Sequence, residues 1–355
     1  MAYDSFLAMN TTIVTQGLPE RWSKQARSWF AFAEAQLSRF LPDSELSRLN
    51  RADGGTFLAT PLLYQALEEA DRYYRETGGL FSPYLGRVLE RLGYDVSFEQ
   101  MMERAVNGER DRSAAGRKRS RGAGGGADGD VDGGAGDSSG AAVGDPRVHG
   151  LNGHPAYADG SPAAEFDPRT RAIRLNPGLS VDLGGIAKGW TARHLAKLAR
   201  QDGVRTGAVS AGGDLVVWGC PTDGWRIGIA DPWRPERDLA ALTLRKGAGI
   251  ATSSAVKRGW TSRDGVARHH IVDPRTGIPA QADLAQATVI APDAVMAEAY
   301  AKCVLVLGSD QGPAWLERAN PRCATIGVRY DGSLVYGGEL EPYLMEERVL
   351  HERMG

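Results

Sequence analysis

Cysteine is scarce in this sequence, which has Cys220, Cys303 and Cys323 among its 355 residues. Three unevenly spaced cysteines exclude a disulfide framework, and the lack of any CxxC pair argues against a zinc site. Runs of about 18 apolar residues are also lacking, so we expect no membrane-spanning helix. The first residues show no basic segment ahead of a long apolar core. Together these absences predict a cytoplasmic protein.

A net charge of one sign is also missing. Forty-two lysines and arginines balance 44 aspartates and glutamates, which leaves a formal charge of −2. No overall field would attract the protein to nucleic acid or to an anionic membrane, so we expect neither partner. Any anionic ligand must be held by local groups. Hydrophobic residues make up 42% of the chain, which is enough to build a buried core.

Residues 106–147 contain no aromatic side chain and almost no large aliphatic one. Such a segment cannot bury enough apolar surface to offset the entropy lost on ordering. The composition therefore predicts a disordered, low-complexity insertion. Its basic first half and acidic second half could pair with each other or bind a partner, although a solvated linker is the simpler interpretation.

The rest of the chain mixes helical and strand patterns. Helices are predicted over 22–41, 61–77, 186–201 and 293–307, with a short capped helix within PDSELSRLN (42–50). Strands are predicted over 172–175, 207–209, 215–219, 225–229, 239–244, 250–253, 268–272 and 287–290. The Asp331-Gly332 pair suits a type I′ hairpin turn. Because helices and strands do not alternate strictly, the pattern favours an α+β fold.

The segment VDLGGIAKGW (181–190) contains paired glycines at the predicted start of a helix. Gly184 and Gly185 allow positive φ or close approach to a ligand, and the free N–H groups of a helix start attract anions. Lys188 would reinforce such a site, so the turn is a candidate phosphate site. The alternative is an ordinary strand-to-helix connection with a solvated lysine, since the spacing fits neither the GxGxxG nor the P-loop pattern.

Two further segments could carry chemistry. In AVSAGGDLVVWG (208–219), a tight turn would aim the Asp214 carboxylate, although a plain hairpin fits as well. In RHHIVDPRTGIP (268–279), strand alternation places His269 and His270 on opposite faces. One of the two could then face a cleft as a general base, whereas a single histidine in a strand usually has a structural role.

In this order and at these distances, the three segments resemble the ApbE-type FAD:protein FMN transferases, a flavin transferase family. The resemblance extends through LSRFLPDSELSRLN, TGGLFSPYLGRVLERLGY and ATVIAPDAVMAEAYAKCVLVLG, and so covers nearly all of the chain outside 106–147. It implies one ApbE-like, T-fold-related α+β domain over 1–355, with mixed antiparallel sheets and flanking helices. FAD would lie in a cleft between two halves of this domain.

The resemblance also implies a reaction. The FMN part of FAD would be transferred to a threonine or serine hydroxyl of a target flavoprotein, and AMP would be released. Two alternatives stay open from the sequence. Water in place of the acceptor hydroxyl would make the protein an FAD pyrophosphatase that yields FMN and AMP, and an altered metal site would leave a flavoprotein that binds FAD without turnover.

Site residues follow from the same resemblance. The implied FAD contacts are Met9, Phe40, Leu80, Phe81, Ser82, Asp182, Lys188 and Ile271. Ser82 stands where the family has an aspartate. His270 is the candidate base for the acceptor hydroxyl, and Lys188 is expected to neutralise charge during catalysis. Arg193 replaces a usual aspartate and lies either on the outer side of its helix or in the cleft.

The implied magnesium site departs most from the family. The Gly185 carbonyl matches one ligand, but Glu298 and Lys302 stand where the family has an aspartate and a threonine. Glutamate can bind magnesium, whereas an ammonium has three donors and no acceptor. At about 4 Å and an effective dielectric near 20, its charge repels a divalent ion by roughly 8 kcal/mol. Lys302 therefore either turns away or replaces the ion, or it forms an ordinary i,i+4 helix pair with Glu298.

Overall fold

An eight-stranded antiparallel sheet organises the protein in a computed structural model, which describes residues 2–104, 162–261, 266–343 and 350–351. The predicted insertion at 106–147 lies outside the described residues. The strand order across the sheet is β1-β2-β6-β7-β10-β15-β16-β17. In that order the strands span Tyr3–Ala8, Thr11–Gln16, Gly207–Ala211, Asp214–Trp218, Ala248–Ser254, Leu284–Ala291, Ala324–Arg329 and Leu334–Gly338.

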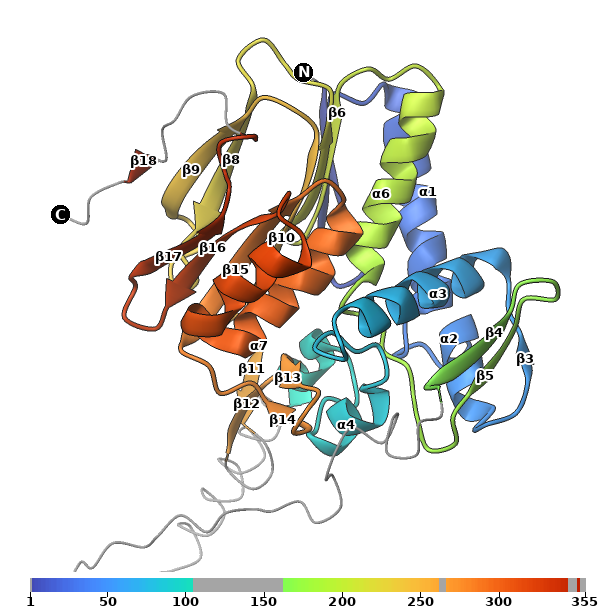
Figure 1. The fold of residues 1–355 in the computed structure, drawn as a ribbon. Coiled ribbons are helices and arrows are strands. Elements are labelled where there is room, and N and C mark those ends of the chain that lie inside the picture. The colour runs from blue at the N-terminus through green and yellow to red at the C-terminus, as the bar shows by residue number, and fades with distance from the viewer. Residues whose placement is uncertain (1, 105–161, 262–265, 344–349, 352–355) are drawn as a thin grey trace, which may run out of the picture.

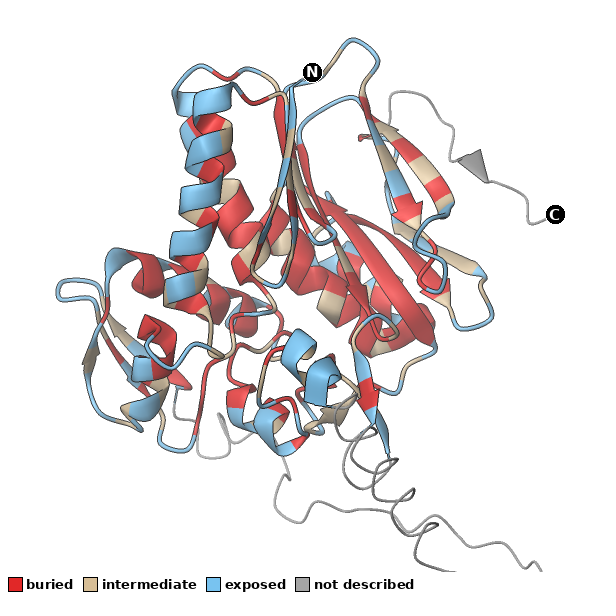
Figure 2. Ribbon diagram, turned by 180° about the vertical axis from the view of Figure 1, so that it is seen from behind, coloured by how far each residue is buried: buried red, intermediate tan, exposed pale blue. Residues whose placement is uncertain are grey.

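Both faces of this sheet are covered, and successive side chains of a strand point to opposite faces. In β10, Ile250 packs on the side of β8 and β9, whereas the next residue, Ala251, packs on the side of the helices. Ile290 and Val289 divide in the same way in β15, where every residue is buried. Figure 2 shows these central strands buried along their length. Burial on both faces explains why they read as continuous apolar runs.

Three helices cover one face, namely α1 (Glu20–Leu37), α6 (Ala187–Gln201) and α7 (Ala294–Ala319) (Figure 1). The other face packs against a smaller sheet of β8 (Trp225–Ala230), β9 (Asp238–Leu244) and β18 (Leu350–His351). α7 is interrupted at Gly308, where φ is 78°. The predicted end at 307 therefore matches the first part of α7, and the second part was missed.

A smaller group of elements lies beside the ends of α6 and α7 (Figure 1). It consists of α2 (Glu45–Arg51), α3 (Pro61–Glu76), α4 (Gly86–Arg91) and a sheet of β3 (Phe57–Leu58), β5 (Ala172–Leu175) and β4 (Ala164–Asp167). The predicted cap of α2 is confirmed, because the Ser44 hydroxyl accepts a hydrogen bond of 3.0 Å from Ser47 N. Among the described residues, no helix is long and apolar enough to cross a bilayer.

Two local predictions are wrong. A type I′ turn needs positive φ at both central residues, but only Gly332 has it, at 85°, whereas Asp331 does not. A three-residue loop with glycine in the left-handed region is therefore formed. The strand predicted over 268–272 is split into β12 (Ala267–His269) and β13 (Val272–Asp273), which pair with β11 (Gly259–Thr261) and β14 (Ile278–Pro279) respectively.

The first hairpin, β1–β2, was not predicted. Its turn consists of Met9 and Asn10, whose φ values of 51° and 53° are both positive. Ala8 pairs with Thr11 on either side of the turn, which is the two-residue geometry of a type I′ hairpin. Asparagine tolerates this conformation better than most residues do, whereas methionine gives no sequence signal for it. The turn carries Met9 into the functional pocket.

Candidate active site

One pocket brings together nearly all of the side chains that the sequence assigns to FAD binding and catalysis. It lies where the β1–β2 turn, the end of α1, the segment after α3 and the starts of α6 and α7 meet. The predicted site residues that line it are Met9, Phe40, Leu80, Phe81, Ser82, Asp182, Gly185, Lys188, His270, Ile271 and Lys302. Glu298 lies just behind this lining, where it contacts Lys188.

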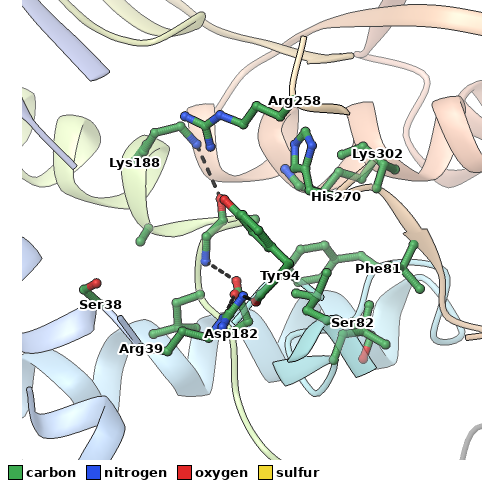
Figure 3. Close-up of a pocket in the computed structure, with 18 of the residues that line it drawn as sticks. Ser38, Arg39, Phe81, Ser82, Tyr94, Asp182, Lys188, Arg258, His270 and Lys302 are labelled. Atoms are coloured by element: carbon green, nitrogen blue, oxygen red, sulfur yellow. Dashed lines mark hydrogen bonds and ion pairs between the residues drawn. The ribbon is translucent and has the colours of Figure 1, made fainter. Parts of the chain in front are cut away.

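Lys188, Arg258 and Lys302 form what we call the basic wall of the pocket. They come from the start of α6, the loop after β10 and the first part of α7. Figure 3 shows them with His270 on one side of the pocket, across from Arg39 and Asp182. Apolar side chains, including Leu80, Leu183 and Val272, complete the lining. The pocket thus offers positive charge next to an apolar surface.

The glycine pair of the VDLGGIAKGW segment is needed for close packing rather than for positive φ. Neither glycine has a positive φ, but a Cβ on Gly185 would lie 2.9 Å from Lys302 Cε and 3.3 Å from a Phe81 ring carbon. Gly184 N donates a 2.7 Å hydrogen bond to Asp182 Oδ1. The backbone N–H groups of Ile186 and Ala187 donate to the Leu183 carbonyl oxygen.

This pairing corrects the prediction for the turn. The expected cradle of free N–H groups is largely used by internal hydrogen bonds. Positive charge in the pocket comes instead from the side chains of the basic wall. The turn contributes by letting Lys302 pass close to the Gly185 backbone.

Lys188 is buried between two carboxylates. Its Nζ lies 2.8 Å from Asp214 Oδ2 and 2.8 Å from Glu298 Oε1, and it donates a 3.5 Å hydrogen bond to the Gly184 carbonyl oxygen. Burial disfavours the ammonium charge, but the attraction of Asp214 and Glu298 outweighs this effect and raises the pKa of Lys188. Lys188 is therefore charged at neutral pH, and all three of its donors are engaged.

Asp214 reaches this cluster from the Gly212-Gly213 turn between β6 and β7. Both glycines have positive φ, 64° and 107°, so the turn aims the carboxylate as the sequence suggested. Burial and the nearby Glu298 charge raise the pKa of Asp214 to about 6, against the attraction of Lys188. A hairpin is present, but it does more than connect two strands, because its turn places the buried Asp214 carboxylate next to Lys188.

Glu298 is fully engaged within the protein. Its Oε1 accepts from Lys188 Nζ, and its Oε2 accepts a 2.9 Å hydrogen bond from Gly189 N. Burial opposes ionisation, but Lys188 and Lys302 outweigh it and lower the pKa of Glu298. Lys302 Nζ lies 3.8 Å from Glu298 Oε1 and donates a 3.3 Å hydrogen bond to the Glu298 carbonyl oxygen. The predicted i,i+4 pair is thus present, and Lys302 also lines the pocket.

These contacts do not fit a magnesium ion held by Gly185, Glu298 and Lys302. The Glu298 oxygens already accept from a lysine and a backbone N–H, and Lys302 brings an ammonium next to the Gly185 backbone. Within the described ranges, no group of three or more histidine, cysteine, aspartate or glutamate side chains could hold a metal. A divalent ion prefers several oxygen ligands, which this cluster does not supply.

Asp182 is held by Arg39, a residue that the sequence did not point to. Arg39 Nε donates to Asp182 Oδ2 in a short ion pair, and its Nη2 donates a 2.7 Å hydrogen bond to the Tyr94 carbonyl oxygen. Its guanidinium carbon lies 4.2 Å from the centroid of the Phe40 ring. Because Asp182 also accepts from Gly184 N, both of its oxygens are engaged, and it links the pocket floor to the α6 turn.

The two neighbouring histidines are in different environments. His269 Nε2 lies 3.1 Å from the Ala280 carbonyl oxygen and does not line the pocket, whereas His270 does. His270 Nδ1 is buried without a hydrogen-bond partner among the described residues. Burial, with help from Arg258 and Lys302, lowers the pKa of His270 well below its ordinary value of 6.5. The imidazole is therefore neutral at pH 7 and able to accept a proton.

Arg193, which stands where the family usually has an aspartate, lies outside the pocket. Its Nη1 and Nη2 lie 2.6 and 2.5 Å from the Glu69 oxygens, and Nη1 also donates to Asp293 at 3.2 Å. Asp293 caps α7 by accepting from Val295 N and Met296 N. Arg193 therefore connects α6, α3 and α7 rather than contacting a ligand.

Sequence reasoning missed Arg39, Tyr94 and Arg258 in the pocket lining. Tyr94 packs on Phe40 with ring centroids 5.4 Å apart, and Arg258 Nη2 donates a 3.4 Å hydrogen bond to the Asn10 carbonyl oxygen. These residues lie in loops or at the ends of elements, where no periodicity predicts their direction. Only the contacts between distant parts of the chain reveal them.

Comparison with known proteins identifies the family of this fold and pocket. A profile of the ApbE family matches residues 8–122 and 149–326. The chain belongs to the ApbE family. The matched ranges contain every residue of the predicted site, from Met9 to Lys302.

Several curated relatives of the chain are named FAD:protein FMN transferase. An FAD:protein FMN transferase of Escherichia coli (strain K12) is 37% identical over 144 residues, which are 40% of this chain and 41% of that protein. The aligned part thus spans about two fifths of that relative. An FAD:protein FMN transferase of Treponema pallidum (strain Nichols) is 28% identical over 299 residues, covering 80% of this chain and 70% of that protein.

Solved ApbE structures share the fold. The ApbE protein of Thermotoga maritima matches with a TM-score of 0.73 and 23% identity, over 97% of this chain and 99% of that chain. The flavin transferase ApbE of Vibrio cholerae matches with a TM-score of 0.68 and 22% identity, over 97% and 99%. At such identities the likeness concerns the fold, and it confirms the predicted α+β class with mixed antiparallel sheets.

Proposed function

We propose that this ApbE-family protein is an FAD:protein FMN transferase, which moves FMN from FAD to a threonine or serine hydroxyl of an acceptor flavoprotein. The observation that carries the proposal is the pairing, in one pocket, of the basic wall with a neutral His270. Cations suit a pyrophosphate, and a neutral imidazole suits a hydroxyl that must lose its proton. The shared name of the curated relatives supports the same reaction.

The reaction exchanges one phosphoester bond for another. The acceptor oxygen forms a bond to the phosphorus on the FMN side of FAD, and the bond from that phosphorus to the bridging oxygen breaks. AMP leaves with the bonding electron pair. The hydroxyl proton passes to a base, for which we propose the imidazole of His270, which lines the pocket. No electron acceptor is needed, because no atom changes oxidation state.

Each part of the pocket has a proposed role in this reaction. Phe81, Leu80 and Ile271 would pack against the flavin, together with Met9, Phe40 and Ser82. Lys188 would offset part of the negative charge of Asp214 and Glu298, so that the pyrophosphate does not meet two uncompensated carboxylates. Asp182 would fix the α6 turn through Gly184 rather than take a ligand contact of its own. We assign no step to magnesium, since the residues around Glu298 do not fit that ion.

The test is to incubate the full chain with FAD and a purified flavoprotein that has a known flavinylated threonine. We expect the acceptor to gain the mass of FMN and AMP to appear in equal amount. An acceptor with that threonine changed to alanine is the matched control. Release of FMN and AMP without an adduct would instead identify an FAD pyrophosphatase, and bound, intact FAD would identify a flavoprotein without turnover.

A further inference from the structure

Lys302 is the member of the basic wall to which no separate role has yet been given. Lys302 lies one helical turn after Glu298 on α7, and 20% of its side chain is exposed, toward the pocket that it lines. Its Cε would lie 2.9 Å from a Cβ on Gly185, so the lysine crosses directly over the α6 turn. Figure 3 shows it beside His270, the proposed base.

Donor counts distinguish the two lysines of the basic wall. Lys188 uses its three donors on Asp214, Glu298 and the Gly184 carbonyl oxygen. Among the residues that the structure describes, Lys302 makes one hydrogen bond, of 3.3 Å to the Glu298 carbonyl oxygen, and one loose ion pair, of 3.8 Å to the Glu298 carboxylate. An ammonium group has three donors, so Lys302 keeps donor capacity for a ligand, whereas Lys188 does not.

The charge balance of the cluster points the same way. Lys188 and Lys302 together cancel the charges of Asp214 and Glu298, and Arg258 leaves the pocket lining with an excess of positive charge at this end. The pyrophosphate of FAD is an anion that would complete this balance. A divalent ion would add further positive charge next to an ammonium, without a set of oxygen ligands to hold it.

We propose that Lys302 binds the pyrophosphate of FAD directly and supplies the charge that a metal ion would otherwise bring, so that this protein uses FAD without a divalent metal. The inference rests on the proposed function. The reaction keeps the bond changes given above, and Lys302 stabilises the negative charge that builds on the phosphate oxygens as the bridging bond breaks. Lys302 acts as a cation in this role and transfers no proton, although burial lowers the pKa of its ammonium group.

The experiment is an FAD titration of the metal-free full chain, followed by fluorescence, with EDTA or with added MgCl₂. We expect Kd to agree within about twofold between the two conditions, because the Lys302 side chain rather than a metal ion supplies the positive charge. A Kd at least about tenfold lower with magnesium would overturn the inference. Absence of FAD binding in both conditions would instead overturn the proposed function, so the two failures are distinguishable.

Variants locate the effect at Lys302. Lys302→Gln should weaken FAD binding about tenfold or more, and Lys302→Arg should restore most of the loss, because the charge returns. Lys197→Gln removes the same charge from the exposed side of α6 and should leave Kd unchanged. Equal binding by Lys302→Gln and the wild type would contradict the inference. If circular dichroism shows that Lys302→Gln does not fold, the FAD titration of the wild type with EDTA or with MgCl₂ still tests the inference.

The pair Glu298→Asp with Lys302→Thr provides a gain-of-function test. It replaces the ammonium by a hydroxyl and should create magnesium binding, which calorimetry detects in the absence of FAD and of any turnover. FAD binding by this double variant should then depend on magnesium. Metal-independent FAD binding as tight as that of the wild type would contradict a role for the Lys302 charge.

Discussion

At the scale of single residues, the site depends on how buried charges are paired. Lys188 is the partner of both Asp214 and Glu298; the two carboxylates are almost entirely buried, and the Lys188 side chain is 16% exposed. Removing one member of such a group leaves the others without compensation in a medium that solvates them poorly. Lys188, Asp214 and Glu298 are therefore needed for the stability of the pocket, and they also contribute to its electrostatic potential.

Lys188→Met should destabilise the protein by about 3 kcal/mol, because two carboxylates then share a buried site without their cation. Urea unfolding at pH 7 measures the change. Lys24→Met is the control, since Lys24 pairs with Glu20 on the exposed side of α1 and should cost less than about 1 kcal/mol. A loss for Lys188→Met as small as that of the control would contradict the pairing described here.

His270→Gln should slow FMN transfer about a hundredfold or more and change the Kd of FAD little, because glutamine cannot accept the hydroxyl proton. The pH profile supplies the second readout. The folded-state pKa of His270 lies well below 6.5, so the neutral base persists as the pH falls through 6.5. The transfer rate should therefore decline only at lower pH. A decline with a midpoint near 6.5 would show that another group is the base.

At the scale of elements, α6 and α7 approach each other closely at Gly189. A Cβ there would lie 2.8 Å from Glu298 Oε2 and 3.1 Å from the Ala294 carbonyl oxygen. A glycine is needed because a Cβ would crowd the Glu298 carboxylate, to which the Gly189 N–H donates across the two helices. This contact fixes the position of Glu298 and, through it, those of Lys188 and Lys302.

Gly189→Ala should therefore cost about 1–3 kcal/mol of stability and also weaken FAD binding, because the added methyl displaces the Glu298 carboxylate. Chemical denaturation and FAD titration measure the two effects. Lys197→Ala, an exposed position of the same helix, should stay within about 0.5 kcal/mol of the wild type. If Gly189→Ala keeps both stability and Kd, the helix contact does not position the site.

Sequence reasoning succeeded where local patterns carry the information. The helix at 61–77 is observed as α3 (Pro61–Glu76), and the strand at 172–175 coincides with β5. It failed where long-range contacts decide the outcome. The β1–β2 hairpin contains a polar strand and an unusual Met9-Asn10 turn, and Arg39 enters the site only because Asp182 and Tyr94 surround it.

At the scale of the whole molecule, the pocket lies where the helices on the large sheet meet the smaller group of elements around α3. Its lining comes from the first residues of the chain, the segment after α3, the α6 turn and α7. All of these belong to the parts of the chain on either side of residues 105–161. We therefore propose that the segment 106–147 is an insertion within one domain over 1–355.

Replacing residues 106–147 with a short glycine-serine linker should leave the Kd of FAD unchanged within about twofold, since surface insertions of this composition carry little stability. Thermal unfolding and FAD titration test this expectation. A variant with the same 106–147 composition in scrambled order separates a specific role from a spacer. Loss of folding in the linker variant would contradict the insertion hypothesis.

The most direct measurement is a crystal structure of the full chain soaked with FAD in the absence of divalent metal. We predict that the pyrophosphate lies within hydrogen-bonding distance of Lys302 Nζ, with the flavin against Phe81 and Ile271 and the phosphorus of the FMN half facing His270. FAD bound outside this pocket, or bound in it with the pyrophosphate directed away from the basic wall, would contradict the proposed site.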